Sequence, residues 1–224
     1  ARVLLHASRS GDAAAKAATA VGQSVSDLLL EDLSASGAGT RLMAAAIEKA
    51  GRVDAVVNNA GIYLPSSLTG DEADWRQGWA QTMAVNVQAP ADICRAAVAH
   101  FREKGGGPNG GIIVNIASRA GHRGDGPDHA AYAASKGAVL AMTKTWARAL
   151  AGENILFYAV APGWVETRMA PQDIENRKLA VKDIPLGRVA APEEVAEMIA
   201  FLASGACPSA TGATFDINGA SYVR

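Results

Sequence analysis

The chain has 224 residues, of which 49% are hydrophobic and 19% charged, a composition that fits one globular domain with a substantial core. Its net charge of −1 gives no electrostatic basis for binding nucleic acid or an anionic membrane surface. No apolar run reaches the roughly 20 residues of a membrane-spanning helix. Cys94 and Cys207 are too far apart for a disulfide framework, and the histidines show no metal-ligand spacing. These features favour a soluble cytoplasmic protein without a metal site.

Apolar runs alternate with helical patterns along the chain, which is typical of βα units around a parallel sheet. The glycine-rich stretch 105–111 has no strand before it and no helix after it, so we interpret it as a turn and not as a phosphate-binding loop. We expect strands at residues 2–7, 26–31, 53–58, 111–117, 155–161 and 213–217, and helices at residues 12–20, 38–50, 71–78, 82–104, 131–151 and 193–203.

Tyr132 and Lys136 lie one turn apart in one of the expected helices, so their side chains share a face. A neighbouring cation favours the phenolate, and a buried pair of this kind can act as a general acid near neutral pH. Taken alone, this spacing is more often a packed tyrosine beside a solvated lysine. The sequence patterns around the pair favour the interpretation as a general acid.

Four further patterns surround this pair in chain order. An asparagine-rich turn follows one apolar strand, a second asparagine opens a helix, a buried strand ends in a serine, and a sharp turn follows another strand. These patterns are Asn58-Asn59-Ala60-Gly61, Asn86-Val87, the run 112–118 ending in Ser118, and the run from Val160 to Thr167. Together with Tyr132 and Lys136, they resemble the short-chain dehydrogenase/reductase family over essentially the whole chain.

The resemblance implies an α/β fold: a Rossmann-type doubly wound parallel sheet in three layers, forming a single NAD(P)-binding domain over residues 1–224. The family's glycine-rich first motif is absent, and the chain begins at what resembles the family's second strand. The first strand lies in the middle of such a sheet, and each buried backbone group left unpaired would cost about 1–3 kcal/mol. We therefore expect a longer protein, with about 30 residues of strand, loop and helix before Ala1.

The resemblance also implies residue roles. Tyr132 would exchange a proton with the substrate oxygen, and Ser118 would polarise that oxygen. Lys136 would lower the pKa of Tyr132 and bind the nicotinamide ribose, while Asn86 would hold a water that feeds protons to Lys136. The implied cofactor contacts are Ser8, Arg9, Asp32, Leu33, Asn59, Ala60, Gly61, Tyr132, Lys136, Pro162, Gly163, Val165 and Thr167. A competing interpretation makes Asp32 a simple helix N-cap.

The end of the second family strand indicates which cofactor is preferred. A site for NAD places a carboxylate there to bind the ribose 2′-hydroxyl. This chain has Ala7, Ser8 and Arg9 at that position, so no carboxylate repels a 2′-phosphate and Arg9 can bind one. We expect NADP(H) as the preferred cofactor, with NAD(H) as the alternative. Arg9 as a solvated loop residue is the competing interpretation.

The expected function is an NADP(H)-dependent oxidoreductase that interconverts a ketone and a secondary alcohol. The runs 160–163 and 185–188 resemble 3-oxoacyl-carrier-protein reductases, although they leave the small-molecule substrate open. The aromatic content of 5% gives no sign of a stacking pocket, and Trp164 fits either the substrate pocket or the surface. In the family, the stretch matching 168–191 is a mobile lid; a solvated loop is the alternative.

Family members assemble as homotetramers or homodimers through helices that match 82–104 and 131–151. The many alanines on these helices, such as Ala96 and Ala97, permit close helix packing. The rival function is a non-catalytic cofactor-binding or scaffold protein that lacks the glycine-rich loop. The joint presence of Asn86, Ser118, Tyr132 and Lys136 argues against this rival.

Overall fold

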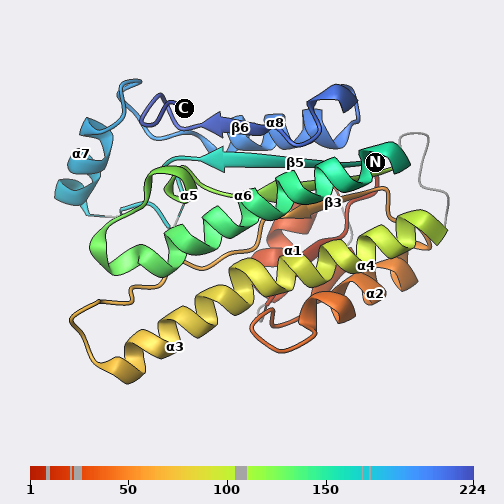
Figure 1. Cartoon of the computed structure of the whole chain (residues 1–224), viewed down its shortest axis with the longest axis horizontal. Helices are drawn as coiled ribbons and strands as arrows, with labels where there is room; N and C mark the ends of the chain where they lie inside the picture. The colour runs from red at the N-terminus through yellow and green to blue at the C-terminus, as the bar shows by residue number, and fades with distance from the viewer. Residues whose placement is uncertain (9–10, 21, 23–26, 104–109, 168, 172) are drawn as a thin grey trace.

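The computed structural model describes residues 1–8, 11–20, 22, 27–103, 110–167, 169–171 and 173–224. Strands and helices alternate along these residues (Figure 1). The strands are β1 (Leu5–Ala7), β2 (Leu28–Leu30), β3 (Ala55–Asn58), β4 (Gly111–Ile116), β5 (Ile155–Pro162) and β6 (Thr214–Ile217). The α-helices are α1 (Gly11–Ala20), α2 (Ala38–Ala50), α3 (Glu72–Met83), α4 (Ala89–Glu103), α5 (Ala120–Arg123), α6 (Ala130–Leu150), α7 (Ile174–Lys182) and α8 (Pro192–Ala203).

All paired strands are parallel, as the alternation of strands and helices predicts. They form a four-stranded sheet in the order β3-β4-β5-β6 and a separate two-stranded sheet of β1 and β2. Among the described residues, no ladder joins β1 to β3. That junction is the position that the family resemblance assigns to its first strand.

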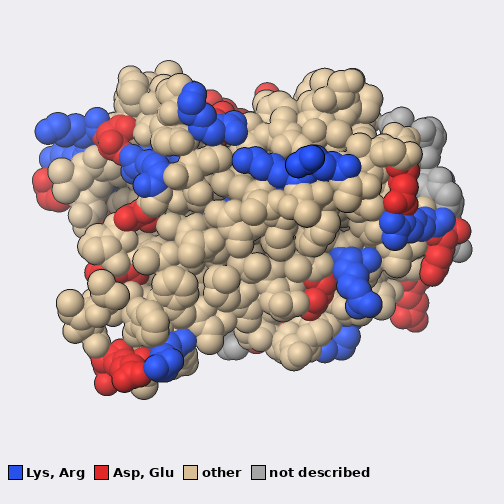
Figure 2. All heavy atoms as spheres, viewed as in Figure 1, with Lys and Arg blue, Asp and Glu red and all other residues tan. Residues whose placement is uncertain are grey.

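Helices lie on both faces of the larger sheet and complete the three layers. In β4 and β5 every residue is buried, and alternate side chains point to opposite faces. Ile112, Val114 and Leu156 pack towards α8, whereas Ile113 and Phe157 pack towards α4 and α6. The outer face over α3, α4 and α6 carries few charged side chains between α4 and α6 (Figure 2).

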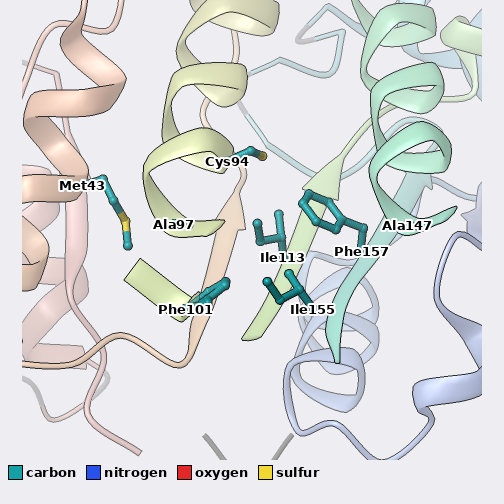
Figure 3. Close-up of a cluster of buried hydrophobic side chains, with 8 residues drawn as sticks. All are labelled: Met43, Cys94, Ala97, Phe101, Ile113, Ala147, Ile155 and Phe157. Atoms are coloured by element: carbon teal, nitrogen blue, oxygen red, sulfur yellow. The ribbon is translucent and has the colours of Figure 1, made fainter. Parts of the chain in front are cut away.

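One of the two main core clusters joins five elements, α4 and α6 among them (Figure 3). Met43 comes from α2, Phe101 from α4, Ile113 from β4, Phe157 from β5 and Ala147 from α6. Phe157 is fully buried and its ring lies 5.7 Å from that of Trp146. This cluster fixes α6 against the sheet, and with it the face that carries Tyr132 and Lys136.

One expectation about helices is wrong, and one helix was not expected. The helices expected at 71–78 and 82–104 form one continuous run, because a π-helical turn (Ala84–Gln88) joins α3 to α4. Such a turn takes up one extra residue within a helix and needs no break. The stretch 168–191 contains α7, capped by Asp173, whose carboxylate accepts a hydrogen bond from the backbone N–H of Asn176 at 2.8 Å. In α7 no described residue is buried.

Candidate active site

Ser118 lies just beyond the carboxyl end of β4 and is buried. Its Oγ accepts a hydrogen bond from the N–H of Ala120 at 3.1 Å and lies 3.5 Å from the carbonyl of Pro162 at the end of β5. The backbone N–H of Arg119 also donates to Pro162, at 2.9 Å. Two neighbouring strand ends therefore fix the position of the serine, at the edge where open parallel sheets bind ligands.

Tyr132 and Lys136 lie on one face of α6, and both are buried. The Lys136 ammonium donates to the carbonyl of Ile116 at 2.7 Å and lies 5.7 Å from the centroid of the Tyr132 ring. Burial lowers the pKa of Lys136 to about 8. Burial also raises the pKa of Tyr132, and a hydrogen bond with Ser118 opposes that rise. The expected lowering of the Tyr132 pKa by Lys136 stays a prediction.

A glycine allows the serine segment to approach α6. A methyl group on Gly121 would lie 2.7 Å from the carbonyl carbon of Lys136, closer than a side chain tolerates. With hydrogen there, α5 rests directly on α6 beside the lysine. The elements that carry Ser118 and Lys136 are thus held together by backbone packing as well as by side chains.

Asn86 lies in the π-helical turn and is buried. Its side-chain oxygen accepts from the N–H of Ile62 at 2.9 Å, and its amide nitrogen donates to the carbonyl of Ile62 at 3.0 Å. The same nitrogen donates to Ser135 Oγ at 3.1 Å, and Ser135 in turn donates to the carbonyl of Tyr132 at 2.7 Å. The side chain of Asn86 therefore ties the segment after β3 to the first turns of α6.

A second polar network lies in the core below these residues. Asn58 Nδ2 donates to Asn115 Oδ1 at 2.8 Å, and Asn115 Nδ2 donates to Thr143 Oγ1 at 2.9 Å. Thr143 donates in turn to the carbonyl of Val139 at 2.8 Å. Asn58 and Asn115 are partners in the β3–β4 register, so the network locks two strands and α6 together.

A cavity of about 630 Å³ opens above the strand ends and brings most of the sequence-predicted residues together. Ser118, Tyr132 and Lys136 line it side by side. The predicted cofactor-binding residues that line it are Asn59, Ala60, Gly61, Tyr132, Lys136, Pro162, Gly163, Val165 and Thr167.

The remaining predicted cofactor contacts lie elsewhere. Ser8 follows β1 and is exposed, and Arg9 falls outside the described residues. Leu33 is buried in a small core cluster below α2, so its side chain does not face the cavity. Asp32 accepts hydrogen bonds from the N–H and the hydroxyl of Ser34, at 3.0 and 2.7 Å. Because α2 begins further along the chain, Asp32 is not the cap of that helix.

The residues around Lys136 fit a nicotinamide cofactor. A methyl group on Gly61 would lie 3.4 Å from Asn86 Oδ1 and 3.5 Å from Lys136 Nζ, so glycine leaves room directly beside the ammonium. Ala60 and Gly163 add further small side chains along the same cavity. A buried cation and small residues at parallel strand ends suit a ribose with its attached ring.

Sequence reasoning missed an aromatic cluster at the cavity. The Tyr63 ring packs edge-on to Tyr132, with centroids 4.8 Å apart, and edge-on to Trp164 at 6.1 Å. The ring of His129 stacks on Tyr63 at 3.8 Å. Burial raises the pKa of Tyr63, and the carboxylate of Asp125 adds to this rise. Of the two interpretations of Trp164, the structure supports the pocket. The sequence did contain a signal for this cluster, because Tyr63 comes two residues after Gly61, which was itself predicted to lie at the site.

Within the described ranges, no three His, Cys, Asp or Glu side chains lie close enough together to hold a metal ion. Among the same residues, no helix has the length and apolar character needed to cross a membrane.

Comparisons with known proteins point to one family. A family model described as "Enoyl-(Acyl carrier protein) reductase" matches residues 1–220. The chain is 40% identical over 174 residues to the 3-oxoacyl-[acyl-carrier-protein] reductase FabG of Thermotoga maritima, covering 77% of this chain and 68% of that protein. It is 35% identical over 201 residues to the trans-4-hydroxycyclohexanecarboxylate dehydrogenase of Sinomonas cyclohexanicum, covering 90% and 73%.

A solved structure resembles the whole chain. It is the crystal structure of a blue fluorescent protein from a metagenomic library in complex with NADPH. The two superpose with a TM-score of 0.85 at 30% sequence identity, over 100% of this chain and 88% of the other.

Proposed function

The chain belongs to the short-chain dehydrogenase/reductase family, and from this premise we propose that it interconverts a ketone and a secondary alcohol with NADP(H). Relatives named as reductases and dehydrogenases make it an NAD(P)-dependent oxidoreductase. The observation that carries the finer proposal is the meeting of Ser118, Tyr132 and Lys136 in one cavity that small residues widen beside the lysine.

The reduction needs a hydride at the carbonyl carbon and a proton at the carbonyl oxygen. When bound, the nicotinamide supplies the hydride. Ser118 donates a hydrogen bond that polarises the carbonyl, and Tyr132 donates its Oη proton to the oxygen as the C–H bond forms. The Lys136 ammonium, which predominates below a pH of about 8, stabilises the phenolate that remains. Oxidation of the alcohol runs through the same groups in reverse.

Asn86 supports a route for replacing the proton. Its side chain is occupied by Ile62 and Ser135, which leaves its backbone carbonyl as the group that could hold a water. Pro90 stands four residues later and has no N–H, so it cannot close the ordinary helical bond to that carbonyl.

Replacing Tyr132 with phenylalanine tests the reaction. We expect kcat to fall by about 10²- to 10⁴-fold because the proton donor is lost. The dissociation constant for NADPH should change less than about twofold, since the ring and its packing remain. Substrates should include a 3-oxoacyl thioester and 4-oxocyclohexanecarboxylate, the ketones that match the two relatives. Normal turnover by the variant would overturn the role of Tyr132, and cofactor binding without any turnover by the wild type would favour a non-catalytic protein.

We propose NADP(H) over NAD(H), supported by the absence of a carboxylate after β1 and by the NADPH-bound structural relative. Arg9→Ala should raise KM for NADPH about tenfold or more and leave KM for NADH nearly unchanged, because the guanidinium would bind only the 2′-phosphate. Ser8→Ala, the neighbouring change, should affect both cofactors less. An unchanged KM for NADPH in Arg9→Ala contradicts the assignment.

We also propose a cytoplasmic homotetramer or homodimer. The cysteine usage supports the location, and the mostly uncharged face between α4 and α6 supports assembly (Figure 2). Sedimentation analysis of the purified protein measures the assembly directly; a monomer at all concentrations would contradict it.

A further inference from the structure

Arg119 is a buried cation that the reaction described above does not use. It follows Ser118 directly, only 6% of it is exposed, and it lines the same cavity. Within the described part of the chain, its Nη1 atom is buried and has no hydrogen-bond partner. A guanidinium stays protonated in proteins and can only donate. Burying such a donor without an acceptor costs free energy. A ligand that places a hydrogen-bond acceptor beside Arg119 Nη1 would therefore be stabilised in this cavity.

Two carboxylates lie near Arg119, but neither accepts a hydrogen bond from its Nη1 atom. Asp183 Oδ2 lies 3.5 Å from Arg119 Nη1, which is too long for a good hydrogen bond, and the Asp183 side chain is half-exposed. The same oxygen accepts from Arg123 Nη1 at 2.9 Å. Asp125 is exposed and interacts with Tyr63, whose pKa it raises. Asp183 thus forms ion pairs with both Arg119 and Arg123, and the charge of Asp125 also acts on Arg119, yet Arg119 Nη1 has no hydrogen-bond acceptor among the described residues.

The charges along the cavity favour an anion. Among the described residues that line it, the cations are Arg119, Arg123 and Lys136, and the one carboxylate is Asp125. A low-dielectric pocket strengthens the attraction between such cations and an anionic ligand.

The position of Arg119 points to the substrate side of the cavity. Its backbone is fixed by the bond to Pro162, in the turn that also places Ser118. Tyr63 packs edge-on against both Tyr132 and Trp164, and all three rings line the same cavity. A compact carbon skeleton beside these rings could present its carbonyl to Tyr132 and a second group to the guanidinium.

We propose that the substrate carries a carboxylate and that Arg119 binds it, so the enzyme acts on a small keto acid and the matching hydroxy acid. The inference rests on the proposed function, because Tyr132 and Ser118 hold the carbonyl. A guanidinium presents parallel N–H groups that match the two oxygens of a carboxylate. Arg119 is then a specificity-determining residue beside the proton donor.

The test compares a keto acid with its neutral ester. The probes are 4-oxocyclohexanecarboxylate and its methyl ester, which share the ring and the ketone, assayed with NADPH. The wild type should show a kcat/KM about tenfold or more higher for the acid. Arg119→Met should lower kcat/KM for the acid by about tenfold or more and leave the ester within about threefold. Arg123→Met, which removes a cation from the same cavity, is the matched control. It should lower kcat/KM for the acid by a smaller factor than Arg119→Met does.

Two binding measurements accompany the assays. Cyclohexanecarboxylate, which cannot react, should bind the wild type with NADP⁺ present and bind Arg119→Met much more weakly by calorimetry. The dissociation constant for NADPH should be the same in both proteins. If Arg119→Met does not fold, Arg119→Lys keeps the charge, loses the paired donors, and should retain part of the preference for the acid.

Each other outcome overturns the inference. Equal losses of kcat/KM for the acid and the ester in Arg119→Met would show that Arg119 has only a structural role. Weaker NADPH binding by this variant would show that Arg119 contacts the cofactor instead. Turnover of the ester, or of a 3-oxoacyl thioester, with no preference for the acid would reject the carboxylate while the proposed function stands. No turnover of any ketone, together with intact NADPH binding, would reject the proposed function itself.

Discussion

The two sheets differ sharply in burial. Every residue of β4 and β5 is buried, whereas β1 and β2 contain no buried residue and Leu30 is 55% exposed. The predicted site residues divide in the same way. Ser118, Tyr132 and Lys136 rest on the four-stranded sheet, while Ser8 and Asp32 follow the two outer strands. The groups that would perform the chemistry therefore have a rigid scaffold of their own, independent of the strands expected near the adenosine.

The largest expected effect is the difference in stability lost when a side chain is truncated in each of the two sheets. Phe157→Ala removes a fully buried ring from the cluster in Figure 3 and should lower the free energy of unfolding by about 3–5 kcal/mol. Leu30→Ala, at an exposed position of β2, should cost less than about 1 kcal/mol. Urea unfolding of both variants measures the difference. Similar losses would mean that the outer strands are as tightly packed as the inner ones.

A smaller effect tests whether the polar network stabilises the larger sheet. Thr143→Val removes the acceptor for Asn115 Nδ2 in the core and should cost about 1–3 kcal/mol, because a buried donor loses its partner. Thr145 makes the same bond to its own helix, to Ala141 at 2.9 Å, but on the exposed side. Thr145→Val should therefore cost less than about 0.5 kcal/mol. Equal effects in urea unfolding would show that the network adds nothing.

The smallest effect concerns the pH dependence of stability. The pKa of Lys136 is about 8 in the folded chain, below its ordinary value of 10.5. Between these values the unfolded chain binds more protons, so raising the pH from 8 to 10 favours the folded state through this group. The gain should be about 1–2 kcal/mol for the wild type relative to Lys136→Met.

Other buried groups act in the opposite direction, so the useful quantity is the difference between the two proteins. Burial raises the pKa of Cys94 to about 12 and also raises the pKa of Tyr132 and of Tyr158. The contribution of each of these groups to stability falls as the pH rises above its ordinary pKa. All three remain in the Lys136→Met variant. Unfolding curves with the same pH dependence in the two proteins would contradict a lowered pKa of Lys136.

Most strands and helices could be predicted from the sequence because hydrophobic periodicity and residue propensity indicate the same elements in this chain. The buried strands around Ile113 and Phe157 are continuous apolar runs, and the helix around Tyr132 is rich in alanine. Prediction from the sequence failed where the local sequence pattern and the tertiary contacts favour different structures. No helix was expected within 168–191, the stretch interpreted as a lid or a solvated loop, yet Asp173 caps a helix there. The π-helical turn at Asn86 depends on hydrogen bonds to distant segments, which no local pattern reports.

The same distinction applies to the site. Residues within recognisable motifs, such as Ser118 and Lys136, line the cavity as predicted. Tyr63 and Arg119 sit beside those motifs but belong to none of them. Arg119 stands out because it is buried with an unpaired Nη1 atom, and Tyr63 because its ring packs against Tyr132. Both features depend on the packing of segments far apart in sequence. Leu33, also predicted from a motif position, has a buried side chain in a small core cluster, and its contact with the cofactor stays a prediction.

The length of α6 has a consequence for how the molecule opens. Its 21 residues span roughly 31 Å, with Tyr132 lining the cavity near one end and Ala147 packed in the core cluster of Figure 3 near the other. Amide hydrogens around Tyr132 and Lys136 should then exchange with solvent only when the whole domain unfolds. In α7, where no described residue is buried, exchange can proceed through local opening.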